Sequence, residues 1–315
     1  MGSVKQIYSE SDKRRLPSNV YLWRYVSLRT LFFYLTGNIF IPAIETLRLE
    51  DPFEGKFHFD IVWFNTVMHE RYGERLNEIQ GWIYRELCTD AEKKDIEINK
   101  NYPNQAARIF ERHFFNFLRR TRYAWCWFLS ASESAAMWNI YGKHGVAIAS
   151  TTKKLSGLLS KSKWDFEVGQ MRYIRLIGGE AQDYDFNPEK AKDAAFLLKP
   201  HFLKRKEYES ENEVRFVTAA PERGPKSGIF LDEISPSEWI QEIRFWPGLK
   251  PVEEKSLKQI VEHFASGIPC TRSDLFGANV SSNEFVSHFE AKLHEIDWNS
   301  WKDGSDNVPA ELKQL

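Results

Sequence analysis

The amino-acid sequence predicts a mixed α+β protein with a helical insertion. Short apolar or alternating runs recur from residue 20 to residue 272 and are typical of strands. Helices are predicted between them, above all over residues 60–121, where apolar side chains recur at the spacing of a helical face. We therefore expect one domain over residues 20–296, after a flexible segment at 1–19 and before a polar tail at 297–315.

Composition limits the class of protein. The formal net charge is −1, so no overall field attracts nucleic acid or an anionic membrane. The 11 Trp, 12 Tyr and 23 Phe suit a packed core and argue against disorder. No apolar run approaches the roughly 18 residues that span a bilayer, and the first residues lack the apolar core of a signal peptide. We expect a soluble, cytoplasmic protein that does not bind membranes.

The cysteines and two of the histidines predict no metal site. Cys88, Cys126 and Cys270 lie far apart and form no Cys-x-x-Cys pair, a pattern typical of buried thiols in a reduced protein. His69 and His113 fall in the helical region without a partner at the spacing of metal ligands. We interpret both histidines as structural or exposed.

The first elements form a strand, a helix and a strand. Residues 20–27 are rich in β-forming side chains, and Ser27 is a candidate N-cap for the helix that ends at Gly37. A second strand is predicted at 39–44. Arg24 is a lone charge within the first strand.

A buried arginine is almost always paired. Two alternatives are open for Arg24. It forms a salt bridge to Asp51 or Glu54 in the Asp-Pro-Phe-Glu-Gly turn, or it binds an anionic ligand.

Two serines follow a predicted buried strand at 123–129. Ser130 and Ser132 are both candidate N-caps for a helix over 133–141, which precedes a strand at 144–150. Capping alone would explain these serines. The functional alternative is that their hydroxyl groups lie at the end of the strand, beside a ligand.

The segment 211–217 alternates polar and apolar residues, as a half-buried strand does. This pattern places Glu211, Glu213 and Arg215 on one face, with Val214 and Phe216 on the other. Two carboxylates on one face repel each other, so they need a compensating cation such as Arg215 or they act on a ligand. The structural alternative is a solvent-facing edge strand.

Two charged stretches are predicted to be solvated. Residues 89–104 combine many charges with a proline and are interpreted as a linker between helices. Lys204, Arg205 and Lys206 precede the Glu-x-Glu motif and lie among nearby acidic residues, which is typical of a solvated face.

The order of these motifs resembles a known bacterial family. YLWRY, DPFEG, FLSASES, MWNIYGKHGVAIA, ESENEVRFV and WIQEIRFWPGL together resemble the family called domain of unknown function 2971, over about residues 20–275. An arginine on the first strand, a strand ending in Ser-x-Ser and a later strand with Glu-x-Glu also resemble the R-S-E arrangement of ADP-ribosyltransferases. That second resemblance implies mixed central sheets of the ADP-ribosyltransferase type and NAD as the cofactor.

The resemblance to ADP-ribosyltransferases also implies roles for individual residues. Glu213 would stabilise the oxocarbenium-like transition state through the ribose 2′-hydroxyl, and Glu211 would orient or deprotonate the acceptor. Arg24 would hold a phosphate or ribose, and Ser130 would orient Arg24 or Glu213. Ser132 would belong to the same site, where Tyr25, Trp138 or Tyr141 could stack on nicotinamide. The expected acceptor is RNA, DNA or protein, in a toxin or anti-phage effector with an antitoxin as a possible inhibitory partner.

Two other classes of function stay open. One is a non-catalytic module that binds a nucleotide or a phage component in the same cleft. The other is a metal-dependent nuclease built from Asp51, Glu54, Glu211 and Glu213, which would need magnesium.

Overall fold

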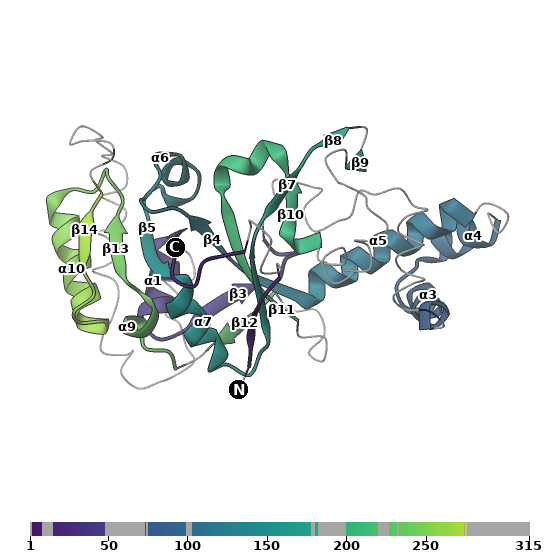
Figure 1. The fold of residues 1–315 in the computed structure, drawn as a ribbon, viewed down its shortest axis with the longest axis horizontal. Coiled ribbons are helices and arrows are strands. Elements are labelled where there is room, and N and C mark those ends of the chain that lie inside the picture. The colour runs from purple at the N-terminus through teal and green to yellow at the C-terminus, as the bar shows by residue number, and fades with distance from the viewer. Residues whose placement is uncertain are drawn as a thin grey trace. The chain divides into compact units, whose positions relative to one another are not determined.

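The computed structural model describes residues 2–7, 15–47, 73, 75–98, 103–177, 180–181, 200–219, 227–231, 233–273 and 275. Within them the protein is mixed α+β, as predicted, with a large mixed sheet and several helices (Figure 1). The chain divides into two compact units, each made of three separate stretches. The first unit comprises Met1–Leu16, Ile41–Trp127 and Leu159–Ile229, and the second comprises Pro17–Phe40, Phe128–Leu158 and Phe230–Leu315.

Four strands form the sheet of the first unit. Their order is β1 (Val4–Gln6), β6 (Phe166–Gln170), β11 (Glu213–Ala219) and β4 (Arg122–Leu129). Strand β1 runs parallel to β6, and β11 runs antiparallel to it. Strand β11 is therefore an interior strand with neighbours on both sides, and all of its residues except the last are buried.

Strand β1 belongs to the segment predicted to be flexible. Val4 pairs with Phe166, and the backbone N–H of Gly2 donates to the carbonyl oxygen of Ser162 at 2.7 Å. Ser3 donates to the carboxylate of Asp165 through its backbone and its hydroxyl, at 2.8 and 2.7 Å. A three-residue strand is too short to produce a sequence pattern, and it forms because the edge of β6 offers backbone partners.

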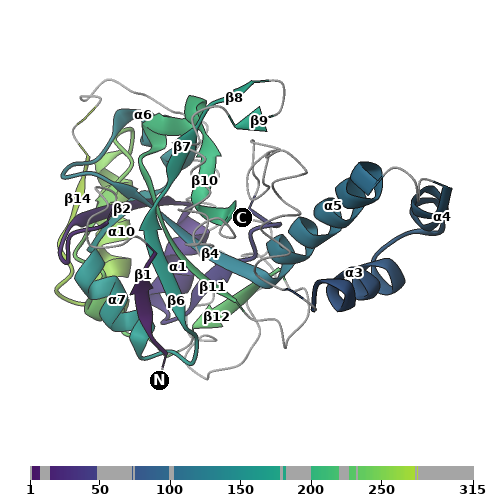
Figure 2. The same ribbon diagram turned by 45° about the vertical axis from the view of Figure 1, so that its right-hand side comes forward.

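The predicted helical region is mostly helical where it is described. It contains α3 (Arg75–Glu86), α4 (Asp90–Ile98) and α5 (Pro103–Thr121) (Figure 2). Trp82 of α3 packs against Phe117 of α5 with ring centroids 5.0 Å apart. The core beneath these helices consists of Ile83, Cys88, Ala107, Phe114, Phe115, Ile174 and Leu203.

The prediction of a linker over 89–104 is wrong, because α4 occupies most of it, but its solvated character is confirmed for α4, which buries none of its residues. Helix α4 buries none of its residues, so it lacks the apolar periodicity that would predict it. A capping box starts it instead: the backbone N–H of Thr89 donates to Glu92 at 2.8 Å, and the N–H of Glu92 donates to the Thr89 hydroxyl at 3.3 Å.

The second unit contains the predicted opening of strand, helix and strand. Strand β2 (Tyr21–Val26) leads into α1 (Leu28–Leu35), and the hydroxyl of Ser27 accepts the N–H of Thr30 at 3.2 Å. The N-cap prediction is therefore confirmed. Gly37 follows α1 with φ of 83°, a conformation that favours glycine.

The strands of the second unit follow the order β2, β5 (Val146–Thr151), β13 (Glu242–Phe245) and β14 (Cys270–Arg272). At the edge of β2, Leu22 and Trp23 pair with Leu129 and Phe128, the last two residues of β4. Every residue of β5 is buried. These strands lie where the apolar runs of the sequence predict them.

The remaining elements are short, apart from two helices. The helical ones are α6 (Ala135–Met137), the π-helix η1 (Trp138–Gly142), α7 (Thr152–Ser160), η3 (Pro200–Phe202), η4 (Lys206–Glu211), α9 (Pro236–Trp239) and α10 (Pro251–Phe264). The strands are β3 (Ile39–Pro42), β7 (Arg172–Ile174), β8 (Leu176–Ile177), β9 (Glu180–Ala181), β10 (Leu203–Arg205) and β12 (Gly228–Leu231). Strand β3 pairs with β12, β7 with β10 and β8 with β9.

Several predictions lie outside the described residues. They concern Asp51, Glu54, His69 and the tail at 297–315. Among the helices that the structure describes, none combines the length and the apolar character that a bilayer crossing requires. The single domain over 20–296 stays a prediction.

Candidate functional site

The two carboxylates of the Glu-x-Glu motif meet in the first unit. Glu213 is the first residue of β11, whereas Glu211 is the last residue of the 3-10 helix η4. Asn212 between them has a left-handed backbone with φ of 40°. The prediction that Glu211 shares a strand face with Glu213 is therefore wrong, because the strand begins only after this turn. Glu211 and Glu213 are nevertheless both buried, with 8% and 7% of their surfaces exposed.

Lys204 joins the two carboxylates. Its ammonium group contacts Oε2 of Glu211 and lies 3.4 Å from Oε2 of Glu213. The ring of Tyr208 covers it, with the ring centroid 5.0 Å from Nζ. Lys204 is buried on β10, so the prediction of a solvated face is wrong for this residue. The short connection from β10 through η4 to β11 brings these charges together.

Arg215 compensates the negative charge of Glu213, as one of the sequence-based alternatives predicts. Its Nε and Nη2 atoms donate to the two carboxylate oxygens of Glu213 at 2.7 and 3.1 Å, a forked arrangement. Its Nη1 donates to the carbonyl oxygen of His201 at 2.9 Å. Only 1% of Arg215 is exposed, so the alternative of a solvent-facing edge strand is wrong.

Burial dominates the protonation of the site. It raises the pKa of the Glu213 carboxyl, and the positive charge of Lys204 opposes this. Burial also lowers the pKa of Arg215 to about 9. The hydroxyl of Tyr173 accepts the backbone N–H of Glu213 at 2.8 Å. Two carboxylates and two cations thus form one balanced, hydrogen-bonded network.

Arg24 and Tyr25 belong to the second unit. Arg24 is half-buried on β2, and its Nε donates to the Tyr34 hydroxyl at 3.1 Å. Tyr25 is a core residue whose hydroxyl accepts the backbone N–H of Ser134 at 2.6 Å. Its ring meets the edge of Trp138 with centroids 5.1 Å apart, and burial raises the pKa of its hydroxyl.

The serine motif forms a short turn after β4. The hydroxyl of Ser130 accepts the backbone N–H of Ser132 at 3.2 Å. The N-cap of α6 is Ser134, whose hydroxyl accepts the N–H of Met137 at 3.4 Å. The prediction that Ser130 or Ser132 caps this helix is wrong, since the helix starts later. Ser130 is half-buried and Ser132 is exposed.

Tyr141 is an exposed aromatic residue beside a buried one. The helix predicted over 133–141 is divided into α6 and the π-helix η1, which ends at Gly142 as predicted. Tyr141 is 48% exposed, whereas Trp138 is fully buried. A side chain at Gly142 would lie 2.4 Å from the Trp138 ring, so the close approach requires glycine.

The predicted site residues fall into two groups. Glu211 and Glu213 are brought together in the first unit, whereas Arg24, Tyr25, Ser130, Ser132 and Tyr141 belong to the second. Their assembly into one NAD site stays a prediction. Sequence reasoning missed the role of Lys204, although its position directly after the apolar pair Phe202-Leu203 was a signal of burial.

No family model, curated protein or solved structure matches this chain.

Proposed function

We propose that the protein is an NAD-dependent ADP-ribosyltransferase that modifies RNA, DNA or protein, with a fold of the ADP-ribosyltransferase type. The observation that carries this proposal is the convergence of Glu211 and Glu213 on Lys204 at the start of an interior strand. Buried ion networks are often no more stable than an apolar core of the same volume. A functional role would account for the presence of two buried carboxylates in this network.

The chemistry requires a carboxylate that is charged and fixed in orientation. Cleavage of the nicotinamide–ribose bond develops positive charge on the ribose, which a carboxylate stabilises. In this proposal Glu213 acts there through the ribose 2′-hydroxyl, with Arg215 fixing its orientation by two hydrogen bonds. Glu211 orients or deprotonates the acceptor. The positive charge of Lys204 favours the ionised form of Glu213, against the effect of burial.

Residues of the second unit would bind NAD. Arg24 suits a phosphate or ribose, because its guanidinium group is planar and permanently charged. Ser130 and Ser132 offer hydroxyl groups for orientation. Tyr141 is the exposed aromatic side chain of its turn and would stack on nicotinamide, while Tyr25 and Trp138 support that turn from the core.

A second candidate is a module that binds a nucleotide or a phage component without turnover. One observation favours it: the four charges at Lys204, Glu211, Glu213 and Arg215 already balance one another. The nuclease alternative requires a metal ion between the two carboxylates, at a place where both contact the Lys204 ammonium. In either role, a toxin or anti-phage effector would have an antitoxin as its inhibitory partner.

Nicotinamide release tests the proposal. Purified protein is incubated with NAD, with and without cell lysate, beside the variants Glu213→Gln and Glu209→Gln. We expect release by the wild-type protein, a loss of about a hundredfold or more in Glu213→Gln, and unchanged release in Glu209→Gln. Glu209 is the matched control because it lies in the same 3-10 helix but is exposed.

The variant must be folded for this result to count. Glu213→Gln disturbs the pair with Arg215, so its melting temperature is measured, and Glu211→Gln is assayed as a second variant. Undiminished release in a folded Glu213→Gln protein would overturn the assigned role. NAD at about 100 times its dissociation constant stabilises by about 2.7 kcal/mol, so a melting shift without any release would favour the binding module. Magnesium-dependent, chelator-sensitive cleavage of nucleic acid would favour the nuclease.

A further inference from the structure

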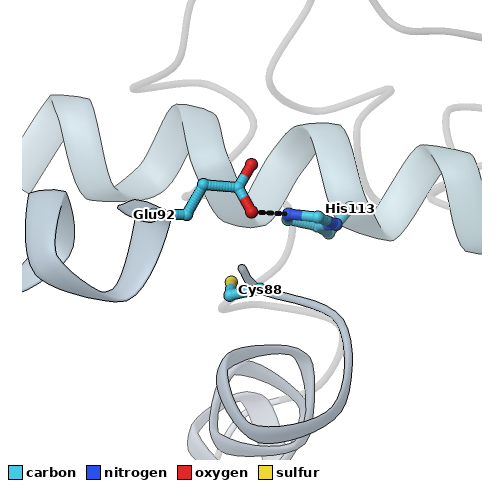
Figure 3. A group of neighbouring side chains, drawn as sticks. All are labelled: Cys88, Glu92 and His113. Carbon is cyan, nitrogen blue, oxygen red and sulfur yellow. Dashed lines mark hydrogen bonds and ion pairs between the residues drawn. The ribbon is translucent and has the colours of Figure 1, made fainter. Parts of the chain in front are cut away.

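Three side chains with metal-ligating atoms meet in the helical region of the first unit (Figure 3). Cys88 follows α3, Glu92 lies in the first turn of α4, and His113 lies in α5. The Cys88 sulfur, a carboxylate oxygen of Glu92 and a ring nitrogen of His113 all lie within 4.8 Å of one another. Figure 3 shows the three side chains directed toward a common point.

Glu92 is held in place by several partners. Its Oε2 atom accepts the backbone N–H and the hydroxyl of Thr89 at 2.8 and 3.0 Å, and it lies 3.0 Å from Nε2 of His113. Its other oxygen contacts Arg112. A capped helix start with a hydrogen-bonded histidine would account for these contacts alone. Cys88, a buried thiol (7% exposed) of the apolar core of these helices, lies within the same radius and adds a soft ligand atom to the group.

We propose that Cys88, Glu92 and His113 bind a divalent metal ion of the zinc class. Thiolate, imidazole and carboxylate are the three side-chain ligands that zinc takes in proteins, with bonds of about 2.0–2.3 Å. The thiolate selects zinc over magnesium and calcium, which prefer oxygen ligands. One thiolate and one carboxylate neutralise a divalent ion. A water molecule completes a four-coordinate shell, because three protein ligands leave one position open.

A metal ion bound by these three side chains would connect separate parts of the helical region. Its ligands come from the loop after α3, the start of α4 and the middle of α5. Helix α4 buries no residue completely, and Ile96 is its partly buried contact with the apolar core. A bound ion would tie this exposed helix to its two neighbours. This inference goes beyond the proposed transferase activity and does not depend on it.

Cobalt and zinc binding to the full-length protein test the proposal. Cobalt(II) bound to a thiolate gives a sulfur-to-cobalt charge-transfer absorption, and zinc affinity is measured by competition with a chromophoric chelator. We expect one equivalent of metal and the thiolate absorption in the wild-type protein. We expect Cys88→Ser to lose the absorption, and Cys88→Ser and His113→Gln each to weaken zinc binding by about a hundredfold.

The controls use the same substitutions elsewhere in the chain. Cys270→Ser and His263→Gln change residues of the second unit and are expected to bind zinc as the wild-type protein does. Circular dichroism of each metal-free variant establishes that it is folded. Absence of the cobalt–thiolate absorption in the wild-type protein would overturn the proposal, and so would equal zinc affinity in the wild-type and folded Cys88→Ser proteins. Neither readout involves NAD, so failure of the transferase proposal would be a separate result.

Discussion

Two cations of different chemistry hold the carboxylate of Glu213. Arg215 binds both oxygens with its planar fork, whereas Lys204 is a point charge shared with Glu211. Arg215 can be replaced by lysine only with loss of the second hydrogen bond. Each cation offsets the desolvation of a buried carboxylate, so removing either leaves uncompensated charge.

Lys204→Met is expected to lower the free energy of unfolding by about 3–5 kcal/mol at pH 8. Methionine fills a similar volume but leaves Glu211 and Glu213 with Arg215 as the remaining cation of the network. The loss should be smaller at pH 5. Burial raises the pKa of Glu213, and protonation of this carboxyl removes its repulsion with Glu211. Urea unfolding at both pH values measures this difference.

Lys206→Met is the matched control, since Lys206 lies two residues further on and is exposed. Its effect should stay within about 0.5 kcal/mol. Equal stability of the two variants would show that the contacts of Lys204 carry no net stabilisation.

Helix α5 contains a partly buried carboxyl group, that of Glu111, whose negative charge is disfavoured by burial. Burial raises the pKa of Glu111 to about 7, and the positive charge of Arg108 only partly opposes this. The Glu111 carboxyl therefore binds its proton more tightly in the folded state than in the unfolded state, where its pKa is 4.5. The resulting stabilisation is complete below pH 4.5 and is lost as the pH rises to about 7.

Glu111→Gln should therefore stabilise the protein at pH 8 but not at pH 4. Allowing for the partial exposure of Glu111, we expect a gain on the order of 1–2 kcal/mol at pH 8. Melting temperatures of the wild-type and variant proteins across this pH range provide the measurement. Glu86→Gln, at an exposed position on α3, is the control. A constant difference between wild-type and Glu111→Gln proteins at all pH values would contradict the assignment.

The two units of the whole molecule are interleaved along the chain. The chain passes from one unit to the other at five places, after Leu16, Phe40, Trp127, Leu158 and Ile229. In the first unit, β1 and most of β4 come from the N-terminal half, whereas β6 and β11 come from the C-terminal half. No single cut in the chain can therefore separate the strands of one unit from those of the other.

Fragments 1–158 and 159–315 should each fail to fold. Each one lacks strands of both units, so apolar faces of the remaining strands would lose their cover. Thermal melts followed by circular dichroism, with the full-length protein as control, should show no cooperative transition for either fragment. A cooperative melt of one fragment would mean that the contacts within it suffice for folding.

The sequence by itself determined the elements that have local causes. The strand at β2, the Ser27 cap, the buried run of β4 and the strand at β5 follow from side-chain periodicity and capping, which involve neighbouring residues only. The chemical type of the candidate site, two carboxylates with a nearby cation, was also predictable. Helix α4 was not, because it has a cap but no apolar periodicity.

The tertiary structure alone decided which charges meet. The left-handed turn at Asn212 removes Glu211 from the strand. Lys204 is buried on strand β10, which pairs with β7. Cys88, Glu92 and His113 approach one another from a loop and two helices, with no regular spacing. The physical reason is the same in each case: sequence separation describes distance along the chain, whereas ion pairs and metal ligation depend on distances in space.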